Sequence, residues 1–568
     1  LLAEGHGLGG DDVHERSALD AGADGVVDLF GGVGVVREDD SLDNHFHDTV
    51  SGGDWLCEQD VVEYFVENAP KELTQLEHWG CPWSRKEDGK VNVRPFGGMK
   101  IPRTWFAADK TGFHILHTLF QTSIKYPSIK RFDEHFVLDL LVHDGRPQGV
   151  VCFDIQNGVT RIIQAKSVII ATGGGSRVYR FNTNGGIVTG DGMALAYRHG
   201  VPLRDMEFVQ YHPTGLPGSG ILMTEGCRGE GGILLNKDGY RYLQDYGLGP
   251  EIPVGETKNK YMELGPRDRL SQAFWQEQQK GRTIKSPFGD IVHLDLRHLG
   301  EKKLLERLPF ICELSRAYVG VDPVKEPIPV RPVVHYTMGG IETDGMGATR
   351  MPGLFAVGEC ASNGLHGANR LGSNSLCEIV VFGKVAGEQA ALFAKEHSHI
   401  DSNILYRQGM EVVAKSMSLM ENGGTENPAD IRNEMGDAME SGVGIYRTAE
   451  TMQNTIDKLK ELKERYKRVR VADKSSVFNT DWLYTIELGF LLDVAESVAH
   501  SAMQRKESRG SHQRIDGYEE RDDVNYLKHS LAFRNEDGAP TIEYSDVKIT
   551  KSQPAKRVYG SEAEKGAK

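Results

Sequence analysis

One stretch of sequence restricts the fold more than any other: residues 161–172, RIIQAKSVIIAT, which lead directly into Gly173–Gly175. The run is long and largely apolar, which predicts a strand buried on both faces. A second strand-like run, GLFAVG at residues 353–358, ends at Glu359. Buried parallel strands that end in glycine-rich turns are typical of doubly wound sheets, which bind nucleotides at the carboxyl ends of their strands. We therefore predict an α/β fold with a Rossmann-like nucleotide-binding domain.

Outside these strands the chain changes character twice. Residues 205–330 are rich in glycine, proline and charge and lack a strand–helix rhythm, so we expect an inserted α+β capping domain. Beyond residue 399, apolar side chains recur at helical spacing and predict a C-terminal helical domain. They are Met452, Ile456, Leu459, Leu462 and Tyr466, then Trp482, Ile486, Phe490, Val494 and Val498. The expected domains are residues 1–204 with 331–398 (nucleotide binding), 205–330 (cap), 399–520 (helical) and 521–568, a polar and irregular extension.

Composition excludes several classes of function. The 568 residues carry a net charge of −15 and no basic stripe with interleaved aromatic residues, which argues against a nucleic-acid partner. No apolar run approaches the roughly 20 residues that span a bilayer, so we expect any membrane contact to be made through a partner. The seven cysteines are scattered, odd in number and never spaced as C-x-x-C. We therefore expect neither a metal site nor a disulfide framework, and a reducing cytoplasm fits this pattern.

The most informative block is residues 205–232, which concentrates His212, Thr224, Glu225 and Arg228 among glycines. Glycines let a ligand approach the backbone, while His, Thr and Arg side chains donate hydrogen bonds to carboxylates. The spacing of Glu225 and Arg228 corresponds to one helical turn or one tight loop, and either allows a charge-assisted hydrogen bond. A lone histidine in such a loop would more often be structural, but the clustering favours a ligand site.

Three further segments have the same character. They are LGPRD at residues 264–268, HYTMGGIETD at 335–344 and HGANRLGSNSL at 366–376. In the last of these, Ser373 or Ser375 would cap a helix whose N-terminus could face an anion or an electron-rich ring. Taken singly, each segment is as well explained by a surface arginine or an ordinary capped helix. Together they predict a pocket for a small dianion beside a nucleotide cofactor.

From about residue 41 to residue 559 the chain resembles the flavoprotein subunits of fumarate reductases, which are relatives of succinate dehydrogenase flavoproteins. Beyond the blocks above, the matching motifs are residues 45–65 (HFHDTVSGGDWLCEQDVVEYF), 96–100, 103–121, 182–196 and 505–514 (RKESRGSHQR). The loop NKYMELGPRD at residues 259–268 resembles the fumarate reductase branch more than succinate dehydrogenases. The resemblance implies reduction of fumarate to succinate by hydride transfer from FAD. Net succinate oxidation and a non-catalytic remnant without tight FAD binding are the alternatives.

The resemblance also implies roles for individual residues. Substrate binding falls to Phe96, His212, Thr224, Glu225, His335 and Arg370. FAD binding falls to Gly31, Gly32, His135, Phe136, Val137, Thr172, Gly173, Gly174, Asp191, Glu359, Arg370, Ser375 and Leu376. Arg267 is expected to deliver the proton, supplied through Arg228 and Glu225. Because the intrinsic pKa of a guanidinium lies above about 12, His212 is the alternative proton donor.

The implied partners are an iron–sulfur subunit, which relays electrons from quinol, and membrane-anchor subunits. This places the chain at the cytoplasmic face of the inner membrane without a span of its own.

The first 36 residues depart from the family pattern, which opens with a strand, a glycine-rich loop for the FAD pyrophosphate and a histidine that bonds covalently to the flavin. Gly5–Gly10 resembles that loop only weakly, and no strand precedes it. The register places the linking histidine near Asp24, where the chain has none. We therefore expect this part to be a frameshifted or misassigned translation that lacks roughly twenty residues in front. With the chain as given, covalent FAD is not expected at the usual place.

Overall fold

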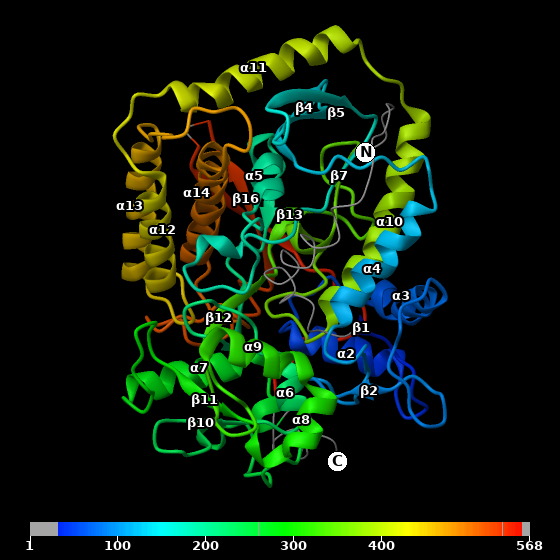
Figure 1. The fold of residues 1–568 in the computed structure, drawn as a ribbon, viewed down its shortest axis with the longest axis vertical. Helices are drawn as coiled ribbons and strands as arrows, with labels where there is room; N and C mark the ends of the chain where they lie inside the picture. The colour runs from blue at the N-terminus through cyan, green and yellow to red at the C-terminus, as the bar shows by residue number, and fades with distance from the viewer. Residues whose placement is uncertain (1–31, 259–260, 537, 559–568) are drawn as a thin grey trace.

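The two runs predicted as buried parallel strands pair with each other. In the computed structural model, which describes residues 32–258, 261–536 and 538–558, β7 (Val168–Ile170) lies parallel to β14 (Leu354–Ala356), with Ile169 opposite Phe355 (Figure 1). The burial predicted for this strand on both faces is wrong, because Ile169 of β7 is 40% exposed. The single long strand expected over residues 161–172 is also wrong. Its first half belongs to β6 (Val159–Gln164) in another sheet, because the chain turns at residues 165–167, where the Ser167 hydroxyl donates to the Ala390 carbonyl.

Four further sheets surround this parallel pair. A three-stranded antiparallel sheet contains β4 (His135–His143), β5 (Arg146–Asp154) and β6. A small sheet has the order β1 (Gly32–Val33), β3 (Thr104–Trp105) and β2 (Val93–Arg94). A four-stranded sheet has the order β10 (Ile233–Leu235), β11 (Val292–Asp295), β12 (Ile328–Thr337) and β9 (Val209–Gly215). The fifth has the order β15 (Ala361–Ser362), β13 (Gly340–Glu342), β8 (Leu203–Arg204), β16 (Lys528–Arg534) and β17 (Pro540–Asp546).

The segment 205–330 holds both helices and strands. Besides β9, β10 and β11 it contains α6 (Glu225–Gly229), α7 (Arg267–Gln279), α8 (Glu301–Arg307) and α9 (Pro309–Val319), which lie together in the lower part of Figure 1. Strand β9 pairs antiparallel with β12, so that His212 lies opposite Val333 and Tyr211 opposite Val334. Irregularities in β12 on either side of Val333–Val334 interrupt the regular register. This strand pair positions the candidate site.

Helices dominate the chain after residue 399, as predicted. They are α11 (Ser402–Glu421), α12 (Pro428–Gly442), α13 (Ala449–Tyr466) and α14 (Thr480–Gln504). The two predicted apolar stripes fall on α13 and α14, and α14 is buried along nearly its whole length. Helices α12, α13 and α14 pack side by side, while α11 crosses over the β4–β5–β6 sheet (Figure 1).

The prediction of an irregular tail after residue 521 is wrong. Strands β16 and β17 form an antiparallel hairpin, and β16 pairs with β8, so that Leu531 lies opposite Arg204. The hairpin was hidden in the sequence because only β16 is largely buried, while the polar β17 forms the edge of the sheet. Residues 548–558, here called the C-terminal strap, then cross the start of α3, where Gln59 accepts hydrogen bonds from the backbone of Thr550 and Ser552.

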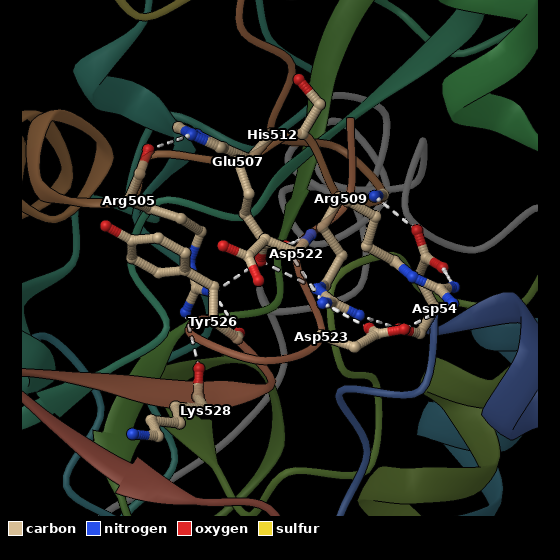
Figure 2. A network of polar contacts seen from close by, with 12 residues as sticks. Asp54, Arg505, Glu507, Arg509, His512, Asp522, Asp523, Tyr526 and Lys528 are labelled. Atoms are coloured by element: carbon tan, nitrogen blue, oxygen red, sulfur yellow. Dashed lines mark hydrogen bonds and ion pairs between the residues drawn. The ribbon is translucent and has the colours of Figure 1, made fainter. Parts of the chain in front are cut away.

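The block RKESRGSHQR forms a buried charge network that ties the end of the chain to its beginning (Figure 2). Arg505 and Arg509 both donate to Glu507, at 2.9 and 2.8 Å. Arg509 also donates to the Asp54 carbonyl and to the Asp523 carboxylate, at 2.9 and 2.8 Å. Buried charges are tolerated only when they are paired and hydrogen-bonded, which explains the density of contacts here.

The remaining helices are α2 (Leu42–Gly52), α3 (Gln59–His78), α4 (Thr111–Ile124), α5 (Asp191–Arg198) and α10 (Asn374–Glu396). Within the described ranges, no helix combines the length and the apolar character needed to cross a bilayer. Three features predicted from the sequence lie outside the described residues: Gly31, the expected position of the linking histidine near Asp24, and the glycine-rich stretch Gly5–Gly10.

Candidate active site

Two histidines from neighbouring strands face each other at the centre of the candidate site. All seven residues of β9 are buried, and His212 lies there with its ring centre 5.3 Å from that of His335 on β12. The Nδ1 atom of His335 is 2.8 Å from the Thr183 hydroxyl, and the Nδ1 atom of His212 accepts from Thr214. These contacts fix both rings, and the strand pairing brings together two residues that are far apart in the sequence.

A buried carboxylate joins two of the predicted arginines. Glu225 begins α6, and the preceding Thr224 caps that helix by accepting a hydrogen bond from Gly226 N at 3.1 Å. Arg267 Nε donates to Glu225 at 2.8 Å, and Arg228 lies 3.6 Å from the same carboxylate, across one helical turn. The structure thus favours the helical-turn alternative. Arg228 makes an ion pair with Glu225 across this turn, at a separation longer than a hydrogen bond.

Gln210, which the sequence analysis missed, holds Arg267 and Arg370 together. Its amide oxygen accepts from Arg267 Nη1 at 3.0 Å and from Arg370 Nη2 at 3.2 Å. Its amide nitrogen donates to Asn369 at 2.9 Å and to the Arg370 carbonyl at 2.8 Å. Gln210 lies two residues before His212, on the same face of β9. That alternation was the one signal in the sequence that pointed to it.

Burial and positive charge together set the protonation of the site. Burial lowers the pKa of His212 far below its usual value, and the charges of Arg267 and Arg228 lower it further. Burial and the charge of Arg370 do the same to the pKa of His335. Burial raises the pKa of Glu225, but Arg267 and Arg228 outweigh it, so that this pKa falls and the carboxylate stays charged. Neutral imidazoles among fixed guanidinium groups suit a ligand with two negative charges.

Glycines without side chains leave room beside these groups. A Cβ on Gly372 would lie 3.2 Å from the buried Phe96 ring and 3.4 Å from Arg267 Nη2, and one on Gly97 would lie 2.6 Å from Glu225. A cavity of about 200 Å³ opens here, lined by Gly97, Arg267 and Arg370 on one side. Residues of α2 and the C-terminal strap line its other side. The cavity is therefore closed by segments from both ends of the chain.

The described part of the predicted nucleotide site fits a nucleotide. Thr172 and Gly173 follow β7, Gly173 has φ +74°, and a Cβ on Gly174 would lie 2.3 Å from the Glu359 carboxylate. Glu359 follows the parallel strand β14 and accepts from Thr337 N at 3.0 Å. Burial raises the pKa of Glu359 to about 7. A backbone that only glycine allows, beside a carboxyl group at the ends of two parallel strands, suits a ribose or phosphate group.

Helix α10 begins next to Arg370, with Ser375 and Leu376 in its first turn. The predicted serine cap is wrong. Ser373 occupies the N-cap position, but with φ +67° its hydroxyl makes no capping hydrogen bond. Instead the Thr104 hydroxyl lies 3.4 Å from it.

Other residues predicted to bind the cofactor lie in different surroundings. His135, Phe136 and Val137 are on β4, where His135 contacts the backbone carbonyl of Asp133, just before the strand, and the Asp154 carboxylate on the neighbouring β5. Asp191 begins α5, and burial raises its pKa to about 6. Gly32 begins β1, packed against Leu73 of α3. Asp191 lies beside the Gly173 turn, because a Cβ on Gly192 would lie 2.3 Å from Thr172 Oγ1 and one on Gly190 would lie 3.4 Å from Gly175 Cα. The roles of all these residues toward a cofactor stay predictions.

The sequence and the fold of this chain match known proteins. The FAD binding domain family matches residues 14–376, and the fumarate reductase flavoprotein C-terminal family matches residues 432–559. The fumarate reductase flavoprotein subunit of Haemophilus influenzae is 71% identical over 535 residues, covering 94% of this chain and 89% of that protein. The Escherichia coli subunit is 70% identical with the same coverage. A solved quinol–fumarate reductase with menaquinol molecules superposes with a TM-score of 0.91 at 69% identity, covering 93% of this chain and 92% of the other.

Proposed function

Because this chain belongs to the family of fumarate reductase flavoprotein subunits, we propose that its buried arginine–histidine cluster is the site where fumarate is reduced to succinate. The observation that carries this assignment is the placement of Arg267 and Arg370 on one shared acceptor, Gln210, beside two neutral histidines. FAD, when bound, supplies the hydride for one alkene carbon. The residues of the chain then have to bind the dicarboxylate and bring a proton to the other carbon.

The carboxylates of the substrate are bound by Arg370, His335, His212 and Thr224. Fixed cations and donors that already point at the developing negative charge lower the barrier without reorganising. The Phe96 ring, buried beside Gly372, packs against the carbon skeleton. The neutral imidazoles therefore act as hydrogen-bond partners that orient the substrate.

Arg267 delivers the proton. The pKa of His212 is held so far below its usual value that this ring carries no extra proton to give near neutral pH, which disfavours it as the acid. Glu225 accepts from Arg267 and lies 3.6 Å from Arg228, so a proton given up by Arg267 is replaced along this row once Arg228 approaches to hydrogen-bond distance. Arg267, Glu225 and Arg228 are all buried and paired with one another, which also disfavours the alternative that the chain is a non-catalytic remnant.

We further propose that the chain works within a membrane-associated complex. The solved relative is a quinol–fumarate reductase with menaquinol molecules, so electrons would arrive from a quinol through an iron–sulfur subunit, with membrane-anchor subunits holding the assembly. The chain would attach peripherally, at the cytoplasmic face of the inner membrane.

The test compares Arg267→Gln with Arg269→Gln, which changes an exposed arginine two residues along the same helix. Fumarate reduction with a reduced dye as donor is measured together with bound FAD. We expect the first variant to lose a factor of about 10²–10⁴ in kcat at unchanged FAD content, as for the loss of a positioned acid. The control should keep the parent rate. A first variant with more than half of the parent kcat would exclude Arg267 as the proton donor.

A further inference from the structure

A second cavity, of about 280 Å³, lies on the side of β9 opposite the dicarboxylate residues. Successive side chains of a strand point to opposite faces, so Tyr211 faces this cavity while Gln210 and His212 face the active site. Strand β12, helix α7 and the end of α12 complete its walls, where these elements meet in Figure 1. The lining is Tyr211, Phe274, Trp275, Gln278, Arg331, Pro332, Glu440, Ser441, Gly444, Ile445 and Tyr446. None of the proposed dicarboxylate residues lines it.

Three polar atoms at this cavity lack partners within the described ranges. Tyr211 is 5% exposed, and its hydroxyl has no hydrogen-bond partner there. The same holds for Arg331 Nε and for one carboxylate oxygen of Glu440. Arg331 and Glu440 lie 3.9 Å apart, which is longer than a hydrogen bond. Buried polar atoms are nearly always satisfied, so three in one cavity point to a missing ligand.

The rest of the wall is aromatic and fixed. The rings of Trp275 and Tyr446 lie 4.5 Å apart, and Phe274 packs beside them from the same helix as Trp275. Arg331 is held by the Phe288 carbonyl at 2.5 Å and lies over the Phe181 ring. Gly444 leaves space in front of Tyr211, since a Cβ there would lie 3.7 Å from the hydroxyl. An apolar wall with a few convergent polar groups is the usual form of a small-molecule site.

We infer that this cavity binds a small zwitterion with an apolar side chain, such as an apolar α-amino acid. The ligand carboxylate pairs with Arg331 and the Tyr211 hydroxyl, and its ammonium group pairs with Glu440. Its side chain packs against Trp275 and Tyr446. Arg331 and Glu440 lie only 3.9 Å apart, so the neighbouring carboxylate and ammonium groups of one α-amino acid can pair with both, whereas a molecule with a single charge pairs with one of them.

Such a ligand touches three of the elements that carry the proposed dicarboxylate and proton-donating groups. Helix α7 begins at Arg267, β12 carries His335 and β9 carries His212. If these elements have two arrangements and the ligand binds one of them more tightly, the ligand shifts the chain toward that arrangement. Fumarate turnover then changes by an amount set by the difference between the two affinities. This regulatory step rests on the proposed function, whereas binding itself does not.

The experiment measures binding by calorimetry on the complete enzyme, with L-phenylalanine as the probe. Two analogues that each lack one charge, 3-phenylpropanoate and 2-phenylethylamine, serve as ligand controls. We expect one L-phenylalanine per chain, with both analogues weaker by about tenfold or more, as for the loss of a charge-assisted contact. Fumarate turnover is recorded with and without the probe, and we expect kcat or KM to change at least twofold.

The variants Glu440→Gln and Tyr211→Phe each remove one of the contacts, and both should weaken binding. Glu434→Gln is the matched control, because Glu434 lies on α12 but pairs with Arg465 of α13. No binding of L-phenylalanine, L-leucine or L-tryptophan at millimolar concentration would overturn the inference, as would equal affinities in Glu440→Gln and Glu434→Gln. If Glu440→Gln does not fold, Tyr211→Phe decides. Binding without fumarate turnover would instead contradict only the proposed function.

Discussion

At the scale of single residues, Gln210 shows how a neutral side chain can organise charged ones. Its one oxygen accepts from both Arg267 and Arg370, and its nitrogen is bound by the loop that carries Arg370. A carboxylate here would neutralise part of the positive charge of Arg267 and Arg370, to which we assign the dicarboxylate site. An amide fixes the two guanidinium groups and leaves their charges available.

We expect Gln210→Leu to lower kcat/KM for fumarate by about 10–100-fold. A hydrogen bond to a charged group contributes roughly 1.5–3 kcal/mol, and the expected loss corresponds to one such contact because the two guanidinium groups share a single acceptor atom. Steady-state kinetics with a reduced dye as donor measure the effect. Gln408→Leu is the control for loss of an amide elsewhere, because Gln408 of α11 donates to the Val142 carbonyl on β4. A kcat/KM for Gln210→Leu within twofold of that control would contradict the bridging role.

The buried histidines should make stability depend on pH. Their pKa values are lower in the folded chain than in the unfolded chain, so the unfolded chain takes up more protons below about pH 6.5. Stability is therefore fully present above that pH and is lost as the pH falls. Each histidine contributes a slope of about 1.4 kcal/mol per pH unit in this window.

We expect His335→Gln to make the stability depend less steeply on pH, by the slope that one buried histidine contributes. The measurement is the apparent melting temperature between pH 6.5 and pH 5, which should fall less steeply for the variant than for the parent. Val333→Ala, a buried change on the same strand that does not titrate, should lower the whole curve and keep its slope. A variant curve parallel to the parent curve would show that His335 does not titrate between the folded and unfolded states.

At the scale of elements, local patterns were sufficient where an element depends on its own sequence. The stripes on α13 and α14 and the paired runs of β7 and β14 were predicted correctly. The break in residues 161–172 was not, because it depends on which distant strands accept each half. The hairpin β16–β17 depends in the same way on β8. Long-range pairing, which a linear pattern does not encode, accounts for both errors.

For the candidate site too, the residues with a local sequence signal were predicted, and those that depend on distant contacts were not. Residue types and glycine-rich spacing predicted the arginines, histidines and Glu225, and the structure brings these side chains together. Gln210 carries no charge, and its role arises only when Arg267 and Arg370, 57 and 160 residues away, reach it. The cap at Ser373 failed because a backbone angle, which residue type does not fix, decides the direction of the hydroxyl.

Helix packing predicts opposite effects for two glycine substitutions. In Gly442→Ala the new Cβ would lie 1.9 Å from the Thr455 hydroxyl, so α12 and α13 must separate, and overpacking of this kind costs about 1–3 kcal/mol. In Gly387→Ala, inside α10, the new Cβ meets nothing within 4 Å. The gain in helix propensity should then stabilise the protein by roughly 0.4–1 kcal/mol. Thermal unfolding of both variants checks the signs, and a stabilised Gly442→Ala would refute the close packing of these helices.

At the scale of the whole molecule, the C-terminal strap joins the two ends of the described chain. Gln59 is fully buried, and its side chain donates to the Ser552 carbonyl at 2.6 Å while accepting from three strap amides. We expect Gln59→Ala to release the strap, so that trypsin cleaves after Lys548 and Lys551 several-fold faster than in the parent. Mass spectrometry of the digest gives the rates. Glu67→Ala, an exposed change on the same helix, is the control, and equal rates in the two variants would mean that Gln59 does not hold the strap.

The five-stranded sheet has a consequence for biosynthesis. Strand β8 pairs with β16, which the ribosome adds more than 300 residues later, on the order of half a minute at usual elongation rates. Until then His529 and Arg505, which bind the Asp205 and Glu207 carboxylates in the folded chain, have not been synthesised. These two acidic groups are therefore without their buried partners. A prematurely terminated chain can never bury them in pairs. The fold of this sheet can therefore be completed only after nearly the whole chain has been synthesised.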